Sequence, residues 1–198
     1  MKWYTAVGVK TECPDDAFRI RTGKQEKDLL GVECYIWNTL LWSFVEEGQI
    51  YGRMTRLLNL AFPEEPVKAK VDLEEFRACF ERLLIRELVI SQEAESLKEA
   101  ARGLFQSASV TCVRRTFGER FLAFCESAAF GNPIRSALQA FKKNPLEASY
   151  KHLLKTIQDN GEMGFPLKEA EEGTLKAVIE LYQNKLLFIQ SVKEGALA

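Results

Sequence analysis

The segment Phe76–Ile90 reads FRACFERLLIRELVI, a pattern that predicts an amphipathic helix running directly into a short strand. Its apolar residues recur at spacings of three and four, which is the spacing of one helix face. Asp72 has the character of an N-cap, and Glu75 three residues later fits a capping box in which Asp stands in for Ser or Thr. We therefore expect a helix over residues 72–87, followed by a β-prone triplet at 88–90.

Two further helices are expected before this segment. The pattern of Gly31–Glu47 predicts a helix whose apolar face is widened by Trp37 and Trp42, which is typical of a central helix. Gly48 is a plausible C-cap for it. A second helix is expected over Gln49–Phe62, and the prolines that follow it begin a linker.

The rest of the chain is expected to be largely helical. Aromatic and β-branched residues, a turn cluster and an alternating stretch predict a β-hairpin over residues 2–22. A strand is expected at 109–113, and an apolar run at 186–189 ends the last helical stretch. Further helices are expected over residues 93–107, 117–129, 133–141, 145–159 and 168–182. The pattern therefore predicts a mainly α, nearly all-α fold with a small β component.

The order helix, Gly-containing turn, helix, linker, helix and short strand resembles the winged helix-turn-helix superfamily over about residues 17–92. The preceding hairpin and Leu30-Gly31 also resemble the small peptide-binding winged-helix chaperones of cofactor-maturation pathways. The resemblance implies a winged-helix-like domain over residues 1–116, with the N-terminal hairpin attached. The remaining residues, 117–198, would then form a helical domain.

A faint internal repeat relates the two halves of the chain. Residues of the segment around Phe80–Ile90 match those around Val178–Phe188 at a constant offset of 98. A second winged-helix-like unit in the C-terminal half would explain the match. Any amphipathic helix followed by an apolar strand would also give this pattern, and we favour that simpler explanation.

The charges are unevenly distributed along the chain. The formal net charge is −1, but residues 98–155 hold 10 Lys/Arg against 4 Asp/Glu, a net of +6, between two acidic ends. One interpretation is that the basic segment docks on its acidic neighbours within the molecule. The other is that it forms a basic surface for a partner. The sequence leaves both open.

The resemblance implies that the helix over residues 72–87 lies in a DNA major groove. Two features depart from that family pattern: the leading turn of the helix is acidic, and the chain turns helical after Ile90 instead of returning as a basic strand. Most DNA affinity would then come from the basic middle of the chain. The residues expected to contact DNA are Arg77, Arg82, Arg86, Lys98, Arg102, Arg114, Arg115 and Arg120.

The sequence contains none of the motifs that mark a catalytic or metal site. His152 is the sole histidine, and there is no P-loop, no GxGxxG and no GxSxG elbow. The five cysteines are far apart and form no CxxC pair, so we expect no metal, no cofactor and no disulfide framework. Cys34, Cys79 and Cys125 lie among apolar neighbours and are expected to be buried. No export signal and no membrane span is evident, which predicts a soluble cytoplasmic protein.

These observations favour a non-catalytic, DNA-binding transcriptional regulator of the winged-helix type, with double-stranded DNA as partner. The acidic third helix and the missing wing favour an alternative, in which the same fold is a protein- or peptide-binding adaptor that makes no DNA contact. A homodimer is compatible with either function. The preference for DNA rests on fold-level analogy, because DNA binding is the commonest use of this fold.

Overall fold

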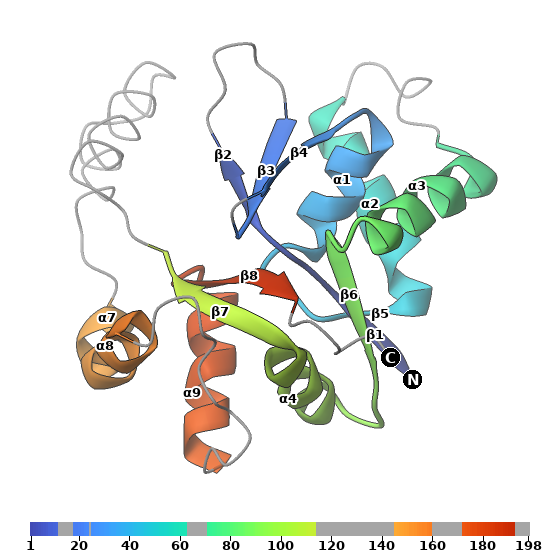
Figure 1. The fold of residues 1–198 in the computed structure, drawn as a ribbon. Coiled ribbons are helices and arrows are strands. Elements are labelled where there is room, and N and C mark those ends of the chain that lie inside the picture. Colours follow the sequence, from blue (N-terminus) through green and yellow to red (C-terminus); the bar gives the residue numbers. More distant parts are fainter. Residues whose placement is uncertain (12–17, 24, 63–70, 114–144, 160–171, 193–198) are drawn as a thin grey trace, which may run out of the picture.

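A computed structural model describes residues 1–11, 18–23, 25–62, 71–113, 145–159 and 172–192 (Figure 1). The helices among them are α1 (Val32–Leu40), α2 (Glu47–Ala61), α3 (Leu73–Ile85), α4 (Leu97–Ser107), α7 (Pro145–Ser149), α8 (Lys151–Asp159) and α9 (Glu172–Gln183). The strands are β1 (Lys2–Ala6), β2 (Val9–Thr11), β3 (Phe18–Thr22), β4 (Gln25–Leu29), β5 (Val45–Glu46), β6 (Val89–Glu93), β7 (Ala108–Cys112) and β8 (Leu187–Val192).

The N-terminal segment is one extended path that joins two sheets. Its first half, β1, lies between β5 and β6 and is antiparallel to both, while its second half, β2, forms an edge of the sheet β2-β3-β4. Gly8 separates the two halves with a φ of 94°, and a Cβ there would overlap the Ile20 side chain and the Arg21 carbonyl. Only glycine fits this close crossing of two strands. The third sheet pairs β7 with β8.

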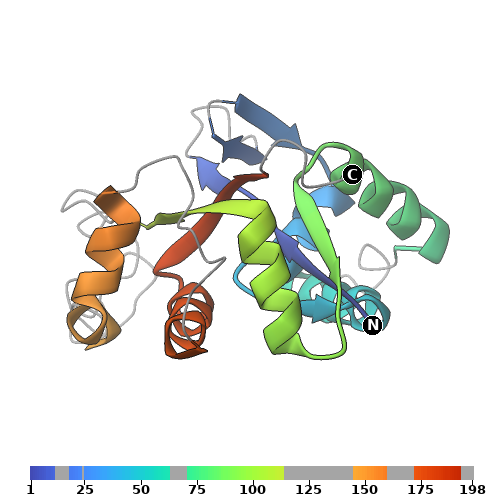
Figure 2. The ribbon, with the colours of Figure 1, turned by 60° about the horizontal axis from the view of Figure 1, so that its bottom comes forward.

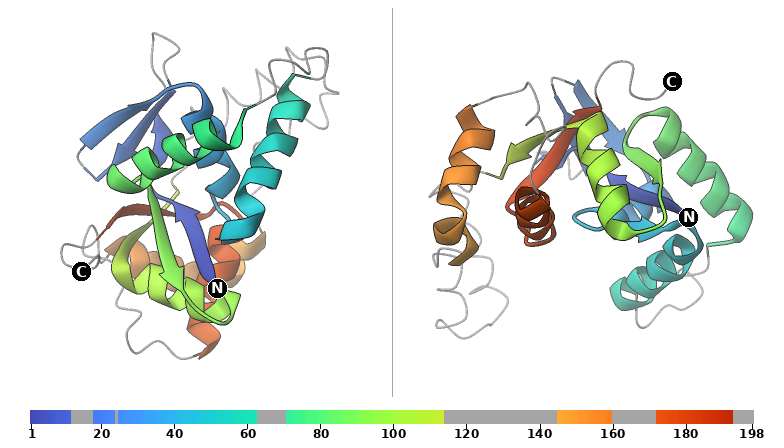
Figure 3. Two further views of the ribbon diagram at one scale, coloured as in Figure 1. Left: turned by 90° about the vertical axis from the view of Figure 1, so that its right-hand side faces the viewer. Right: turned by 90° about the horizontal axis from the view of Figure 1, so that it is seen from below.

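Two hydrophobic cores lie on either side of this path. In the first, α1, α2 and α3 pack against β1 and the β3–β4 hairpin, with Trp37 fully buried at its centre. The second core is built from α4, α9, β7 and β8 around Phe105 and Tyr182. Figure 2 shows α4 and α9 side by side beneath β7 and β8. The α2–α3 pair and the α7–α8 pair lie at opposite ends of the molecule (Figure 3).

Buried hydrogen bonds connect the two cores. The hydroxyls of Thr5 in β1 and Tyr182 in α9 lie 2.7 Å apart, and Trp42 Nε1 donates to the Leu187 carbonyl at 2.9 Å. Burial raises the pKa of the Tyr182 hydroxyl, which stays protonated and satisfied by Thr5. Because these bonds would be lost if either core opened alone, we expect the two cores to unfold together.

The expectation of a mainly α or all-α protein is wrong. Of the described residues, 55% lie in helices and 27% in strands, so the fold is mixed α/β with three sheets. The helix expected over 31–47 ends at Leu40, because Trp42 adopts a left-handed φ of 56° and Val45 turns back to pair with Tyr4. The sequence of β4, QEKDL, is charged and lacks apolar alternation, so only its pairing with β3 identifies it as a strand.

Of the other local predictions, the N-cap at Asp72 and the burial of Cys79 are confirmed, and the burial of Cys34 is not. The Asp72 carboxylate accepts a hydrogen bond from the Glu75 backbone N–H at 2.7 Å, as expected of the N-cap of α3. Cys79 is buried as a free thiol, Cys34 is only half-buried, and Cys125 lies outside the described residues. The helices expected over 117–129 and 133–141 also lie outside them.

The 98-residue sequence repeat corresponds to a repeated structural unit. In each copy a helix, α3 or α9, is followed two residues after its end by a residue with a left-handed backbone and then by a strand, β6 or β8. The two left-handed residues are Glu87, with φ of 55°, and Lys185, with φ of 62°. A left-handed residue just after the last turn is a common way for a helix to end, so the shared turn also agrees with the simpler explanation of two amphipathic helices that each precede a strand.

Candidate functional site

The outward face of α3 is acidic and ends on an apolar side chain. Glu74, Ala78, Glu81 and Ile85 follow one another at spacings of four and three, so they share one face, and all four are exposed. The Ile85 side chain is 81% exposed. Glu74 and the N-cap Asp72 also lie where the helix dipole favours negative charge, so part of this acidity stabilises the helix itself.

Two of the arginines expected to contact DNA are held by a buried carboxylate of α1. Arg82 Nε donates to Glu33 Oε1 at 2.8 Å, and Arg86 Nη1 donates to Glu33 Oε2 at 3.0 Å. The Glu33 side chain is only 6% exposed. Arg86 also donates to the Asp28 carbonyl at 2.6 Å. Because a buried carboxylate is costly without its counter-charges, these arginines are structural ties between α3, α1 and β4.

The basic residues of α4 face the acidic start of α9. The Lys98 ammonium forms an ion pair with the Glu172 carboxylate, and this hydrogen bond holds the pKa of Glu172 below its ordinary value. The charge of Arg102 acts on Glu172 in the same direction. For these two residues the arrangement matches the first interpretation of the charge asymmetry, in which basic residues meet acidic neighbours within the molecule.

Among the described residues, those predicted to contact DNA do not gather on one face. Arg82 and Arg86 meet at Glu33, while Lys98 and Arg102 lie on α4, at the other end of β6 from α3 (Figures 1 and 3). Arg77 is exposed on α3. The remaining three, Arg114, Arg115 and Arg120, lie outside the described residues.

Sequence reasoning missed the role of Glu33. It stands at the start of a predicted helix, where an acidic residue is ordinary and indicates only the helix dipole. Its burial depends on α3 and β4 closing over the start of α1, which are contacts between segments about 50 residues apart in the chain. A signal in the sequence is the pair Arg82 and Arg86, spaced by four on the flank of the apolar stripe.

The described residues hold no group of His, Cys, Asp and Glu side chains that could bind a metal ion. His152 is exposed on α8. Within the same part of the chain, no helix is long and apolar enough to cross a bilayer. Comparisons of the chain with protein-family models, with curated proteins and with solved structures find no match.

Proposed function

We propose that α1, α2, α3 and the sheet β5-β1-β6 form a winged-helix-like module that binds a basic, amphipathic segment of another protein through the outward face of α3. The observation that carries this proposal is that Glu33 binds Arg82 and Arg86, so the outward face presents Glu74, Glu81 and Ile85, with Arg77 as its exposed basic residue. Phosphates would meet repulsion there, whereas lysine or arginine side chains would find charge partners.

The sheet β5-β1-β6 also favours a protein partner over DNA. In a DNA-binding winged helix the strand after the third helix returns as a basic wing, whereas here β6 leads into α4. The strand paired with β6 is instead β1, from the N-terminus, with Tyr4 opposite Ser91 and Ala6 opposite Val89. The partner strand is thus fixed inside the protein and provides no wing that could reach a phosphate backbone.

Exposed apolar side chains on this face and beside it suit an amphipathic partner. Ile85 at the C-terminal end of α3 and Leu73 at its first turn are 81% and 46% exposed. Leu30, which precedes α1 and its Glu33, is 77% exposed. An exposed isoleucine or leucine gains from burial against an apolar side chain of a partner, while the carboxylates between them give orientation.

Fluorescence anisotropy with three labelled probes tests this function in the full chain. The probes are an amphipathic Lys/Leu peptide, its Glu/Leu counterpart of opposite charge, and a random-sequence DNA duplex. We expect the Lys/Leu peptide to bind at low salt and the other two to remain free at micromolar protein. Replacing Glu74 and Glu81 by lysine should weaken peptide binding by about tenfold or more, a change of ~1.4 kcal/mol.

The matched control replaces Glu95 and Asp159, exposed carboxylates of the β6–α4 loop and of α8, by lysine. This variant has the same net charge as the first and should bind the Lys/Leu peptide as the unaltered protein does, apart from a small general charge effect. Equal losses in both variants would contradict a site on α3. A duplex that binds, with an affinity that falls steeply with salt and is lost in Arg114→Ala/Arg115→Ala, would establish the DNA-binding function instead.

A further inference from the structure

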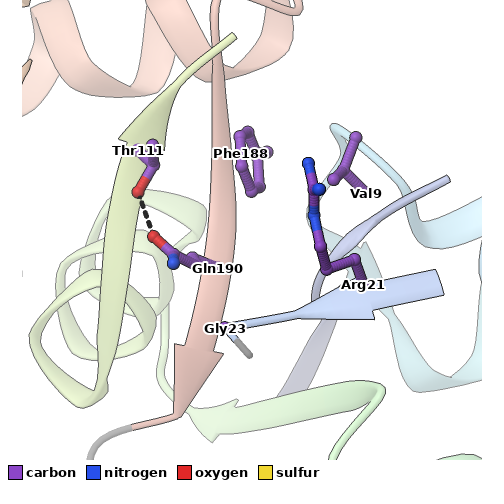
Figure 4. A pocket seen from close by; sticks show the side chains of 6 residues that line it. All are labelled: Val9, Arg21, Gly23, Thr111, Phe188 and Gln190. Carbon is purple, nitrogen blue, oxygen red and sulfur yellow. Dashed lines mark hydrogen bonds between the residues drawn. The ribbon is translucent and has the colours of Figure 1, made fainter. Parts of the chain in front are cut away.

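A pocket of about 280 Å³ lies where the β2–β3 hairpin meets the antiparallel β7–β8 pair (Figure 4). Two backbone hydrogen bonds hold the two sheets together: the Gly8 N–H donates to the Ile189 carbonyl at 2.6 Å, and the Gly23 N–H donates to the Gln190 carbonyl at 3.0 Å. The pocket is lined by Val9, Arg21, Gly23, Thr111, Phe188 and Gln190. Segments from both ends of the chain, together with β7 from its middle, therefore build it.

Strand alternation explains which side chains face this pocket. In β8, Leu187 and Ile189 are buried in the second core, so Phe188 and Gln190 between and beyond them point to the opposite face. In β3, Ile20 is buried and Arg21 turns outward. The lining side chains thus take no part in either core, and their types are not explained by packing.

Arg21 differs from the neighbouring arginine of the same strand. Arg19 Nε donates to Asp28 Oδ1 at 2.6 Å, which holds the pKa of Asp28 below its ordinary value. Arg21 lies two residues further along and points to the same side of the sheet, but its guanidinium has no ion pair or hydrogen bond within the part of the chain that the structure describes. The pocket therefore contains a cation whose donors are available to a ligand.

The Gln190 side chain provides a second hydrogen-bond donor, and Thr111 fixes its orientation. The Thr111 hydroxyl donates to Oε1 of Gln190, which fixes the side-chain amide and leaves its NH₂ group as a donor. The Phe188 ring lies between the Gln190 amide and the Arg21 guanidinium, and the Val9 side chain lies beside that guanidinium, so both provide apolar surface (Figure 4). The lining thus combines one guanidinium, one amide donor and an apolar surface.

We infer that this pocket binds a small organic carboxylate with an apolar body, of about amino-acid size. The planar fork of Arg21 matches a carboxylate, which carries one charge and accepts two parallel hydrogen bonds. A phosphate dianion would need more positive charge than the one guanidinium that lines this pocket. The volume is just below the range of about 300–1,000 Å³ typical of ligand sites, which limits the ligand to a small molecule.

Calorimetric titration of the full chain with three probes tests the ligand class. The probes are phenylacetate, phenylacetamide and phenyl phosphate, which share a ring and differ in the polar group. We expect phenylacetate to bind in about the millimolar range, as suits a ligand of few atoms, and to exceed the neutral amide by about tenfold. Stronger binding of phenyl phosphate than of phenylacetate, or equal binding of acid and amide, would overturn the proposal.

Matched variants test the site itself. Arg21→Gln should abolish the difference between phenylacetate and phenylacetamide, and Phe188→Leu should weaken the binding of both. The control is Arg56→Gln, which removes the same charge from an exposed position of α2 that does not line the pocket. It should leave phenylacetate binding unchanged. If Arg21→Gln retains its circular dichroism spectrum and still prefers the acid, or if Arg56→Gln loses that preference equally, the proposed site is wrong.

Discussion

The two helix–turn–strand units, α3–β6 and α9–β8, end in the same way. The Leu88 N–H donates to the Leu83 carbonyl at 2.9 Å, and 98 residues later the Leu186 N–H donates to the Leu181 carbonyl at 2.9 Å. With a left-handed residue before each donor, both are Schellman motifs. Local chemistry thus produces one structure twice.

What differs is the charge that anchors each helix. Arg82 of α3 binds Glu33 of α1, whereas the corresponding residue of α9 is Glu180, which accepts a hydrogen bond from the Tyr150 hydroxyl at 2.9 Å. The strands also differ, since β6 pairs with β1 and β8 pairs with β7. The comparison shows that the tertiary partner of a helix, rather than the local unit, determines which of its charges remain available to a ligand.

The largest expected effect tests whether the two units belong to one cooperative structure. Leu83 and Leu181 are equivalent and fully buried. Leu83→Ala and Leu181→Ala should each lower the free energy of unfolding by about 2–5 kcal/mol, because each leaves a cavity. Since buried hydrogen bonds connect the cores, both variants should shift a single transition in urea, followed by tryptophan fluorescence and by circular dichroism.

The exposed Leu60 gives the control, and Leu60→Ala should change the free energy of unfolding by less than about 0.5 kcal/mol. Two separate transitions, with Leu83→Ala affecting one and Leu181→Ala the other, would show that the units unfold independently.

A smaller loss of stability is expected when the carboxylate that holds each helix, Glu33 for α3 and Glu180 for α9, is neutralised. Glu33→Gln removes the charge that binds two arginines and should lower the free energy of unfolding by about 1–3 kcal/mol. Glu180→Gln weakens one hydrogen bond to Tyr150 at a half-buried position, so its cost should be below about 1 kcal/mol. Urea denaturation of both variants measures the difference, and equal costs would mean that the Glu33 cluster does not hold α3 and α1 together.

The smallest effect concerns the shared turn. A left-handed backbone disfavours side chains other than glycine, so Glu87→Gly and Lys185→Gly should each raise the free energy of unfolding by up to about 1 kcal/mol. The gain should be smaller at Lys185, whose ammonium lies 5.4 Å from the centre of the Trp42 ring. Lys176→Gly, at an exposed position within α9, is the control and should destabilise by about 0.5–1 kcal/mol. A loss of stability in both turn variants would contradict this assignment of strain.

The sequence by itself determined the features that depend on residues three to five positions apart. The cap at Asp72, the apolar stripe of α3 and the helix-to-strand pattern at two places 98 residues apart are visible in it, because neighbouring side chains and backbone groups form them. The same pattern also predicted a helix past Leu40, because Trp42 and Phe44 continue the helical spacing.

Only the tertiary structure decided where that helix ends and which charges remain free. Trp42 leaves the helical conformation because its indole binds the Leu187 carbonyl, 145 residues away in the sequence. β4 is a strand because β3 pairs with it, and Arg82 is occupied because Glu33 is buried beside it. Arg21 lies opposite Glu26 in the sheet, but the Glu26 carboxylate forms its ion pair with Arg19 at 3.8 Å. Each of these outcomes depends on segments that meet only in the folded chain, which a local pattern does not contain.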